Sequence, residues 1–248
     1  MSDFNKIIDS SGYLLVVHGS RNPLYAQQLQ DLVITIHKRL SLSGVSYRID
    51  TAYLELGKQS LSDKIIDFGQ ELVKKGYKSL KILPLFLLSG THVVEDIPSE
   101  VEIARKYSLI NIEIMSHLGK TDNIISLLKT EYEKWGGDRR ILFCHGTSLR
   151  VGNEEIESLA KKINATVAYW SIAPNLTTII TQLASEHPQK ITILPYFLFH
   201  GKIIDAIASE LNQLQKEVNS ELILLPPLTE IQGLSDLIVD LMVKGSNE

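Results

Sequence analysis

The sequence lacks several features that would place the chain in other classes of protein. It has one cysteine, Cys144, so an intrachain disulfide and a metal site built on paired cysteines are excluded. No apolar stretch approaches the ~20 residues that span a bilayer, and the first residues lack the basic and apolar regions of a secretory signal. The formal net charge is -4, which argues against nucleic acid or an anionic membrane as the main partner. We therefore expect a cytoplasmic protein without nucleic-acid or membrane partners.

Short apolar runs rich in β-branched residues alternate with longer amphipathic stretches, which is typical of strand–helix units on a parallel sheet. We expect strands at residues 13–17, 47–54, 80–87, 110–115, 141–144, 166–170, 191–198 and 222–225. The continuous hydrophobicity of the first four predicts that they are buried on both faces. Helical spacing of apolar side chains predicts a first helix through Leu29, Leu32, Val33, Ile36 and Leu40. Ser60, three positions before Asp63, predicts a capped start for the second helix.

Three short sequence segments of the first half recur in the second half, in similar form and in the same order. LVVHGSR at 15–21 corresponds to LFCHGTSLR at 142–150, TAYLEL at 51–56 to VAYWSI at 167–172, and ILPLFLLSG at 82–90 to ILPYFLFHG at 193–201. Three matched landmarks indicate an internal duplication. We expect an α/β fold of two similar lobes, 1–135 and 136–248, joined at Gly136-Gly137-Asp138. Each lobe would be a roughly four-stranded parallel sheet with helices on both faces, and a single eight-stranded sheet is the alternative.

Three potential metal ligands follow the first three predicted strands. His18 follows the first strand, Glu55 closes the second, and His92 lies shortly after the third. Because the carboxyl ends of parallel strands meet at one edge, these side chains should lie together. Two imidazoles and a carboxylate suit Fe²⁺, Co²⁺, Ni²⁺ or Zn²⁺, and three ligands leave coordination positions open for a substrate. Glu55 stands in an apolar run, where a carboxylate costs desolvation energy unless it has a partner.

Further residues at the same edge could meet an anionic substrate. Small residues after the first and third strands allow backbone N–H groups to approach an anion, and two cations are candidate charge partners. These candidate substrate-binding residues are Gly19, Ser20, Arg21, Ser89, Gly90, Thr91 and Lys202. Three other histidines are interpreted as surface or structural residues: His37, His117 and His187. Gly119-Lys120-Thr121 imitates the end of a P-loop, but Ile114 replaces the required first glycine, so we expect no nucleotide site.

Nearly the whole chain resembles the sirohydrochlorin chelatases, which insert a metal into a tetrapyrrole without ATP. The specific segments are LLVVHGSRNP at 14–23, AYLELGKQSL at 52–61 and LPLFLLSGTHVVEDIP at 83–98. The resemblance implies two flavodoxin-like chelatase lobes with a cleft between them, sirohydrochlorin as substrate, and Fe²⁺ or Co²⁺, with Ni²⁺ as a further option, as the second substrate rather than a permanent cofactor. It assigns metal binding and proton removal to His18, Glu55 and His92. The first lobe would then carry the catalytic residues.

The second lobe departs from this pattern. His145 corresponds to His18, but Ser171 stands in the place of Glu55, and His200 corresponds to Ser89 rather than to His92. Shorter relatives resemble single lobes that dimerise, so this chain resembles a fused version in which one half kept the chemistry, and we expect a monomer. His145 and His200 either face the cleft and touch the substrate or are relics of the duplication.

Two other functions compete with metal insertion. A tetrapyrrole or metal carrier would use the same cleft without catalysis. A phosphate-transferring enzyme of the histidine phosphatase kind would need an arginine immediately before the histidine, and Val17 precedes His18. The ligand set does not discriminate iron from cobalt or nickel, and we favour sirohaem synthesis over cobalamin synthesis as the pathway.

Overall fold

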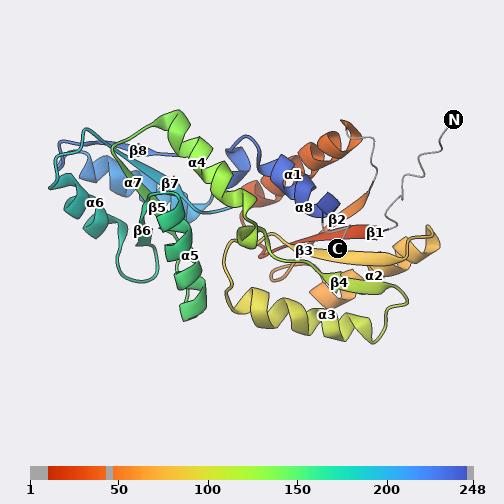
Figure 1. Cartoon of the computed structure of the whole chain (residues 1–248). Helices are drawn as coiled ribbons and strands as arrows, with labels where there is room; N and C mark the ends of the chain where they lie inside the picture. The colour runs from red at the N-terminus through yellow and green to blue at the C-terminus, as the bar shows by residue number, and fades with distance from the viewer. Residues whose placement is uncertain (1–10, 43–46, 245–248) are drawn as a thin grey trace.

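The computed structural model describes residues 11–42 and 47–244, which form two four-stranded parallel sheets (Figure 1). In the first sheet the order is β2-β1-β3-β4, and in the second it is β6-β5-β7-β8. The strands are β1 (Ser11–Val17), β2 (Arg48–Tyr53), β3 (Ser79–Pro84), β4 (Asn111–Ile114), β5 (Arg139–Cys144), β6 (Thr166–Tyr169), β7 (Lys190–Pro195) and β8 (Glu221–Leu224). The two-lobed α/β fold is therefore confirmed, and the alternative of one eight-stranded sheet is wrong.

Helices connect the strands and cover both faces of each sheet. They are α1 (Pro23–Leu42), α2 (Leu61–Lys74), α3 (Ile97–Arg105), α4 (Asn123–Trp135), α5 (Arg150–Lys162), α6 (Leu176–Ala184), α7 (Lys202–Leu214) and α8 (Leu234–Lys244). The predicted stripe of α1 is confirmed, since Leu29, Leu32, Ile36 and Leu40 are buried and Val33 packs against them. The predicted cap of α2 is also confirmed, because Ser60 Oγ accepts a hydrogen bond from the Asp63 N–H. None of the helices within the described ranges combines the length and the hydrophobicity needed to cross a membrane.

Alternating residues of the central strand β1 point to different layers of helices. Leu14 and Val16 pack in the core beneath α2 and α3, whereas Tyr13, Leu15 and Val17 pack in the core beneath α1. All residues of β1 are buried, as the sequence predicted. The same prediction is wrong for the outer strands β2 and β4, which have exposed or half-buried positions, and the outer strands β6 and β8 of the second sheet have such positions too. An outer strand has a neighbour on one side only, and its flank remains open to water.

The strands β3 and β7 end at prolines, earlier than the apolar runs that predicted them. Leu85 and Tyr196 each still donate one backbone hydrogen bond to the neighbouring strand, at 2.8 and 2.7 Å. The chain then leaves the sheet, and the apolar residues 85–88 and 197–199 line a cavity instead. The predicted ends at 87 and 198 are therefore wrong, because apolar side chains that line a cavity have the same composition as those of a buried strand.

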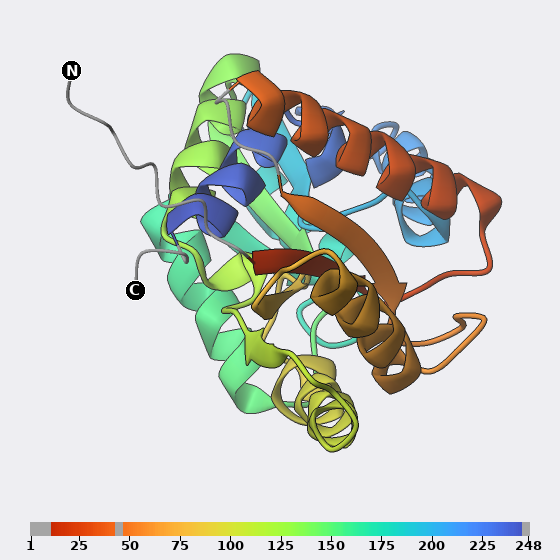
Figure 2. The ribbon, with the colours of Figure 1, turned by 90° about the vertical axis from the view of Figure 1, so that its right-hand side faces the viewer.

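The last helix of each half crosses to the other lobe. The Tyr132 hydroxyl of α4 donates to the Ile141 carbonyl of β5 at 2.6 Å, and α4 packs against β7 of the second sheet. Conversely, the Tyr13 hydroxyl of β1 donates to the Met242 carbonyl of α8 at 2.7 Å. Figure 2 shows α8 (dark blue) beside α1 (orange-red) on the first lobe. One hydrophobic core consequently contains side chains of both lobes, which holds the lobes together.

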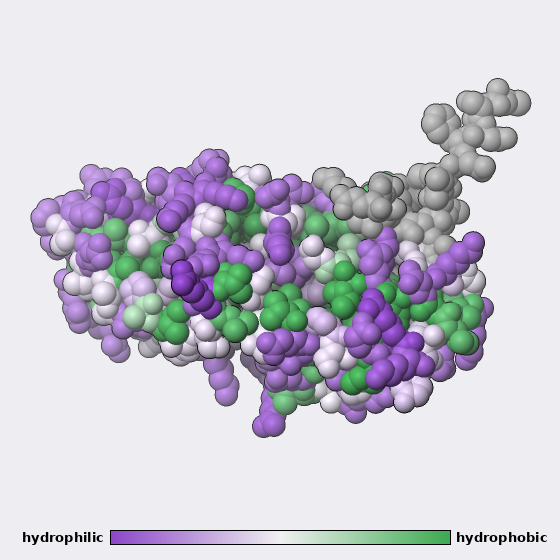
Figure 3. Space-filling model, turned by 60° about the horizontal axis from the view of Figure 1, so that its bottom comes forward, coloured by the Kyte–Doolittle hydropathy of each residue, from purple (hydrophilic) through white to green (hydrophobic). Residues whose placement is uncertain are grey.

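Polar residues dominate the face of the molecule that Figure 3 shows. Figure 3 shows hydrophobic residues in small groups over both lobes, with polar residues between them. Scattered apolar residues of this kind are ordinary for a folded protein. A cavity that combines residues of both lobes is therefore a better place to look for function.

Candidate functional site

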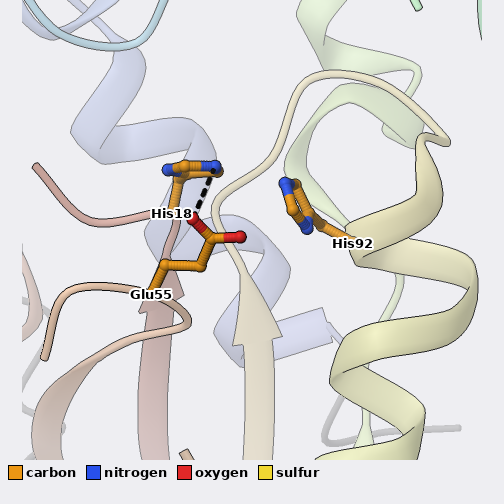
Figure 4. A group of neighbouring side chains, drawn as sticks. All are labelled: His18, Glu55 and His92. Atoms are coloured by element: carbon orange, nitrogen blue, oxygen red, sulfur yellow. Dashed lines mark ion pairs between the residues drawn. The ribbon is translucent and has the colours of Figure 1, made fainter. Parts of the chain in front are cut away.

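The three predicted metal ligands come together in space. His18 follows β1, Glu55 follows β2, and His92 begins a π-helical turn, His92–Asp96, that leads into α3. One ligand atom from each side chain lies within 4.8 Å of the other two, and no other group of three such residues was found in the described part of the chain. The His18 and His92 ring centroids are 4.7 Å apart, and His18 Nε2 lies 3.8 Å from Glu55 Oε2. Figure 4 shows all three side chains pointing toward one another.

Backbone geometry at the ends of β1 and β2 places two of these side chains. The ladder between the strands continues past their ends, since the Glu55 N–H donates to the His18 carbonyl at 2.8 Å. Gly19 then adopts a positive φ of 106°, and a Cβ on it would lie 2.0 Å from the Glu55 carbonyl oxygen. Only glycine fits that position without displacing the backbone that carries the carboxylate.

Both imidazoles make their hydrogen bond through Nδ1 rather than through Nε2. His92 Nδ1 lies 2.7 Å from Asp96 Oδ2, and His18 Nδ1 lies 3.2 Å from the Gly19 carbonyl oxygen. A carbonyl or an ionised carboxylate only accepts hydrogen bonds, so Nδ1 carries the proton in both rings. Each Nε2 atom then keeps its lone pair for a metal ion. This is the usual arrangement of a histidine ligand with an outer hydrogen-bond partner.

Asp96 was missed by the sequence reasoning. Its signal was present, because a carboxylate four residues after a histidine lies on the same face of a helix. The reasoning about Glu55 was also partly wrong, since its side chain is 51% exposed rather than enclosed by apolar neighbours. The strand β2 ends at Tyr53, so the carboxylate projects beyond the sheet into solvent. It is therefore accessible to a cation.

His18 and His92 line a cavity of about 1280 Å³ between the two lobes, whereas Glu55 is not among its lining residues. That volume exceeds the ~300–1,000 Å³ of ordinary small-molecule pockets, so the cavity suits a large ligand. Of the predicted substrate-binding residues, eight line it: Gly19, Ser20, Arg21, Gly90, Thr91, His145, His200 and Lys202. Ser89 does not, because it is buried and its hydroxyl lies 3.0 Å from His117 Nε2.

Aromatic and apolar side chains form much of the remaining wall. Tyr25 of α1 lies against Phe199 of the other lobe, with ring centroids 4.4 Å apart, and both line the cavity. Burial raises the pKa of Tyr25 well above its usual value, so its hydroxyl stays protonated. Sequence reasoning missed these residues, although the repeated runs after β3 and β7 were a signal for an apolar wall. The wall is suited to the faces of a flat, hydrophobic ring system.

The second lobe repeats the backbone of the metal cluster but keeps only one of the three side chains, since His145 corresponds to His18. The Ser171 N–H donates to the His145 carbonyl at 2.9 Å, which matches the contact between Glu55 and His18. A hydroxyl replaces the carboxylate there, and the Ser171 hydroxyl is itself bonded to the His145 carbonyl. His200 reaches the cavity and pairs with Asp205 through Nε2 at 2.9 Å. The duplicated half thus offers the cavity two imidazoles that lie apart from the three-residue cluster.

The other histidines lie away from the cavity. His37 and His187 are exposed, and His117 is only 4% exposed. Burial lowers the pKa of His117, so its ring is neutral at neutral pH. Their interpretation as surface or structural residues agrees with these positions.

Comparisons with known proteins point to one family. The family model CbiX matches residues 12–134 and again 140–244. The chain is 23% identical over 218 residues to a sirohydrochlorin ferrochelatase of Priestia megaterium, which covers 82% of this chain and 79% of that protein. It is also 23% identical over 217 residues to a sirohydrochlorin cobaltochelatase of the same organism, covering 81% and 68%. The solved structure of SirB from Bacillus subtilis with Fe³⁺ superposes with a TM-score of 0.77 at 20% identity, covering 95% of each chain.

Proposed function

The chain belongs to the CbiX family, and from that premise we propose that it inserts a divalent metal ion into a sirohydrochlorin-type tetrapyrrole without ATP. The observation that carries the proposal is the convergence of His18, Glu55 and His92 beside a cavity of about 1280 Å³. The chain is then a chelatase of the lyase class. The resemblance inferred from its motifs agrees with the family match.

Metal insertion requires that the protein bind the metal ion and then release it to the tetrapyrrole. Two imidazole nitrogens and one carboxylate leave coordination positions open, so the tetrapyrrole nitrogens can bind the ion before the protein releases it. Insertion expels two pyrrole N–H protons, which balance the two positive charges that enter the ring. Imidazole groups accept protons near neutral pH, and the histidine ligands become free to do so as the ion leaves them. We assign both roles to His18, Glu55 and His92.

The carboxylates of the tetrapyrrole need positive partners, because the chain as a whole has a formal net charge of -4. Arg21 and Lys202 line the cavity from opposite lobes, and His145 and His200 lie on its second-lobe side. We assign these four residues to the substrate, together with the backbone N–H groups of residues 19–21 and 90–91. Ser89 does not line the cavity, so we do not assign it to the substrate.

The metal is a substrate and not a resident cofactor in this proposal. Relatives named for iron and for cobalt insertion are similar to the chain to the same degree, and the three ligands suit either ion and also Ni²⁺. We favour Fe²⁺ and sirohaem synthesis, with Co²⁺ and cobalamin synthesis second. We further propose a cytoplasmic monomer divided at residues 135 and 136, with the catalytic ligands in the first lobe.

The test is an insertion assay with matched variants. Purified protein with sirohydrochlorin and Co²⁺ or Fe²⁺ should change the tetrapyrrole absorption spectrum faster than His18→Ala does, because that variant lacks one ligand. His145→Ala, the corresponding change in the second lobe, should keep most of kcat and raise KM. Equal rates for wild type and His18→Ala would remove the proposed reaction centre. Stoichiometric tetrapyrrole binding without faster insertion would instead identify a carrier.

A further inference from the structure

Two hydrogen bonds across the lobe boundary are related by the internal duplication. The Ser89 N–H donates to Glu155 Oε2 at 3.3 Å, and the His200 N–H donates to Gln28 Oε1 at 2.9 Å. Ser89 and His200 occupy the same position in the repeated run after β3 and β7. Gln28 and Glu155 each lie ten residues after the histidine that directly follows the first strand of their lobe. The first helix of each lobe, α1 or α5, therefore binds the loop that follows the third strand of the other lobe, which is β7 or β3.

The first-lobe loop is also anchored from within its own lobe. His117 Nδ1 lies 3.0 Å from the Phe86 carbonyl oxygen, so this nitrogen carries the proton and Nε2 accepts from the Ser89 hydroxyl. The Gly119 N–H donates to the same Phe86 carbonyl at 2.9 Å. A Cβ on Gly119 would lie 2.1 Å from the Leu87 carbonyl oxygen, so the two segments are in close contact. Residues 86–89 are thus held on two sides.

The corresponding loop of the second lobe is anchored by backbone hydrogen bonds without a histidine, since the Leu228 N–H donates to the Phe197 carbonyl and the Thr229 N–H donates to the Leu198 carbonyl, each at 3.0 Å. Pro227 stands in the place of His117, and Thr229 stands in the place of Gly119. The His200 side chain is bonded to Asp205 and lines the cavity. The loop with the histidine anchor is the one that leads to a metal ligand, since His92 follows Ser89 by three residues and the second lobe has Ile203 at the position of His92. The difference in anchoring therefore follows the difference in chemistry.

We propose that Glu155 is a positioning residue that acts across the lobe boundary: by holding the Ser89 N–H, it fixes the loop that places His92 against His18 and Glu55. Helix α5 comes close enough for this role, because a Cβ on Gly152 would lie 3.3 Å from the Ser89 carbonyl oxygen. The second lobe then contributes to the metal site through the backbone of the first lobe and supplies no ligand. This inference rests on the proposed function for the role of the metal.

The test compares the two related contacts in the full-length protein. Co²⁺ is titrated without tetrapyrrole, and the ligand-field absorption of the bound ion is recorded. Glu155→Ala should weaken Co²⁺ binding about ten-fold, the lower end of the cost of removing an outer partner of a metal ligand. Glu155→Gln should restore the affinity, because an amide oxygen accepts the same hydrogen bond. Gln28→Ala should leave Co²⁺ affinity and absorption unchanged, and it should raise KM for the tetrapyrrole, because His200 carries no metal-ligand role.

Thermal unfolding separates positioning from a general loss of structure. If Glu155→Ala does not fold, Glu155→Asp makes the same comparison, because it withdraws the acceptor by one methylene and should also weaken Co²⁺ binding. Wild-type affinity in Glu155→Ala, or an equal loss in Gln28→Ala, would overturn the inference while leaving insertion by the wild type intact. A wild type that binds Co²⁺ but does not insert it would overturn the proposed function alone. A wild type without Co²⁺ affinity would overturn both.

Discussion

The hydrogen bond between His92 and Asp96 offers the sharpest test of the metal site. Asp96→Ala removes the carboxylate that lies 2.7 Å from His92 Nδ1 and leaves His92, His18 and Glu55 unchanged. The carboxylate orients the ring and raises the basicity of Nε2, so its loss should weaken metal binding.

The expected size follows from the environment of the pair. Loss of such an outer partner typically costs about ten- to hundred-fold in metal affinity. The His92 and Asp96 side chains are 34% and 46% exposed, so water screens their interaction and the lower end applies. We expect a loss of about ten-fold, or about 1.4 kcal/mol at 25 °C. Asp96→Asn should lie between Asp96→Ala and the wild type, because its amide oxygen still accepts a hydrogen bond.

Isothermal titration with Co²⁺ in the absence of tetrapyrrole measures the effect directly. The second lobe provides the control, since Asp205 bonds His200 at 2.9 Å with similar exposure of the histidine. Asp205→Ala should therefore leave Co²⁺ affinity unchanged. The reasoning is refuted if Asp96→Ala binds Co²⁺ as tightly as the wild type, or if Asp205→Ala loses as much affinity.

Two further predictions concern stability. Gly19→Ala should lower the free energy of unfolding by about 1–3 kcal/mol, because alanine is strained at this φ and its Cβ meets the Glu55 carbonyl. Urea denaturation measures this loss. Gly201→Ala is the control and should be close to neutral, because Gly201 has an extended φ and nothing lies near the position of its Cβ. His117 should make stability depend on pH. Burial lowers its pKa in the folded state, so the unfolded chain takes up the proton first and stability falls as pH decreases below the ordinary value of about 6.5 toward the lowered pKa. Denaturation of His117→Asn should depend less on pH in that window, and an equal dependence in both proteins would contradict this cause.

Local patterns in the sequence determined most of the architecture. Eight strands and two lobes were predicted from apolar runs, from apolar residues at helical spacing and from the repeated sequence segments. Such local signals suffice because burial on a strand or helix depends on periodicity over a few residues. The meeting of His18, Glu55 and His92 was also predictable, although whole strand–helix units separate them. Parallel strands bring their carboxyl ends to one edge, so position along the chain translates into position in space.

The tertiary structure alone decided how the two lobes act on each other. The exchange of α4 and α8 and the contact between Glu155 and Ser89 depend on the relative placement of two sheets. No periodicity within either lobe encodes that placement, because it is set by side chains that meet only after both lobes have formed. The exposure of Glu55 was hidden for a related reason, since its apolar neighbours in sequence point elsewhere once β2 ends at Tyr53. Sequence spacing thus determined which residues reach the sheet edge, and packing between the lobes decided what surrounds them there.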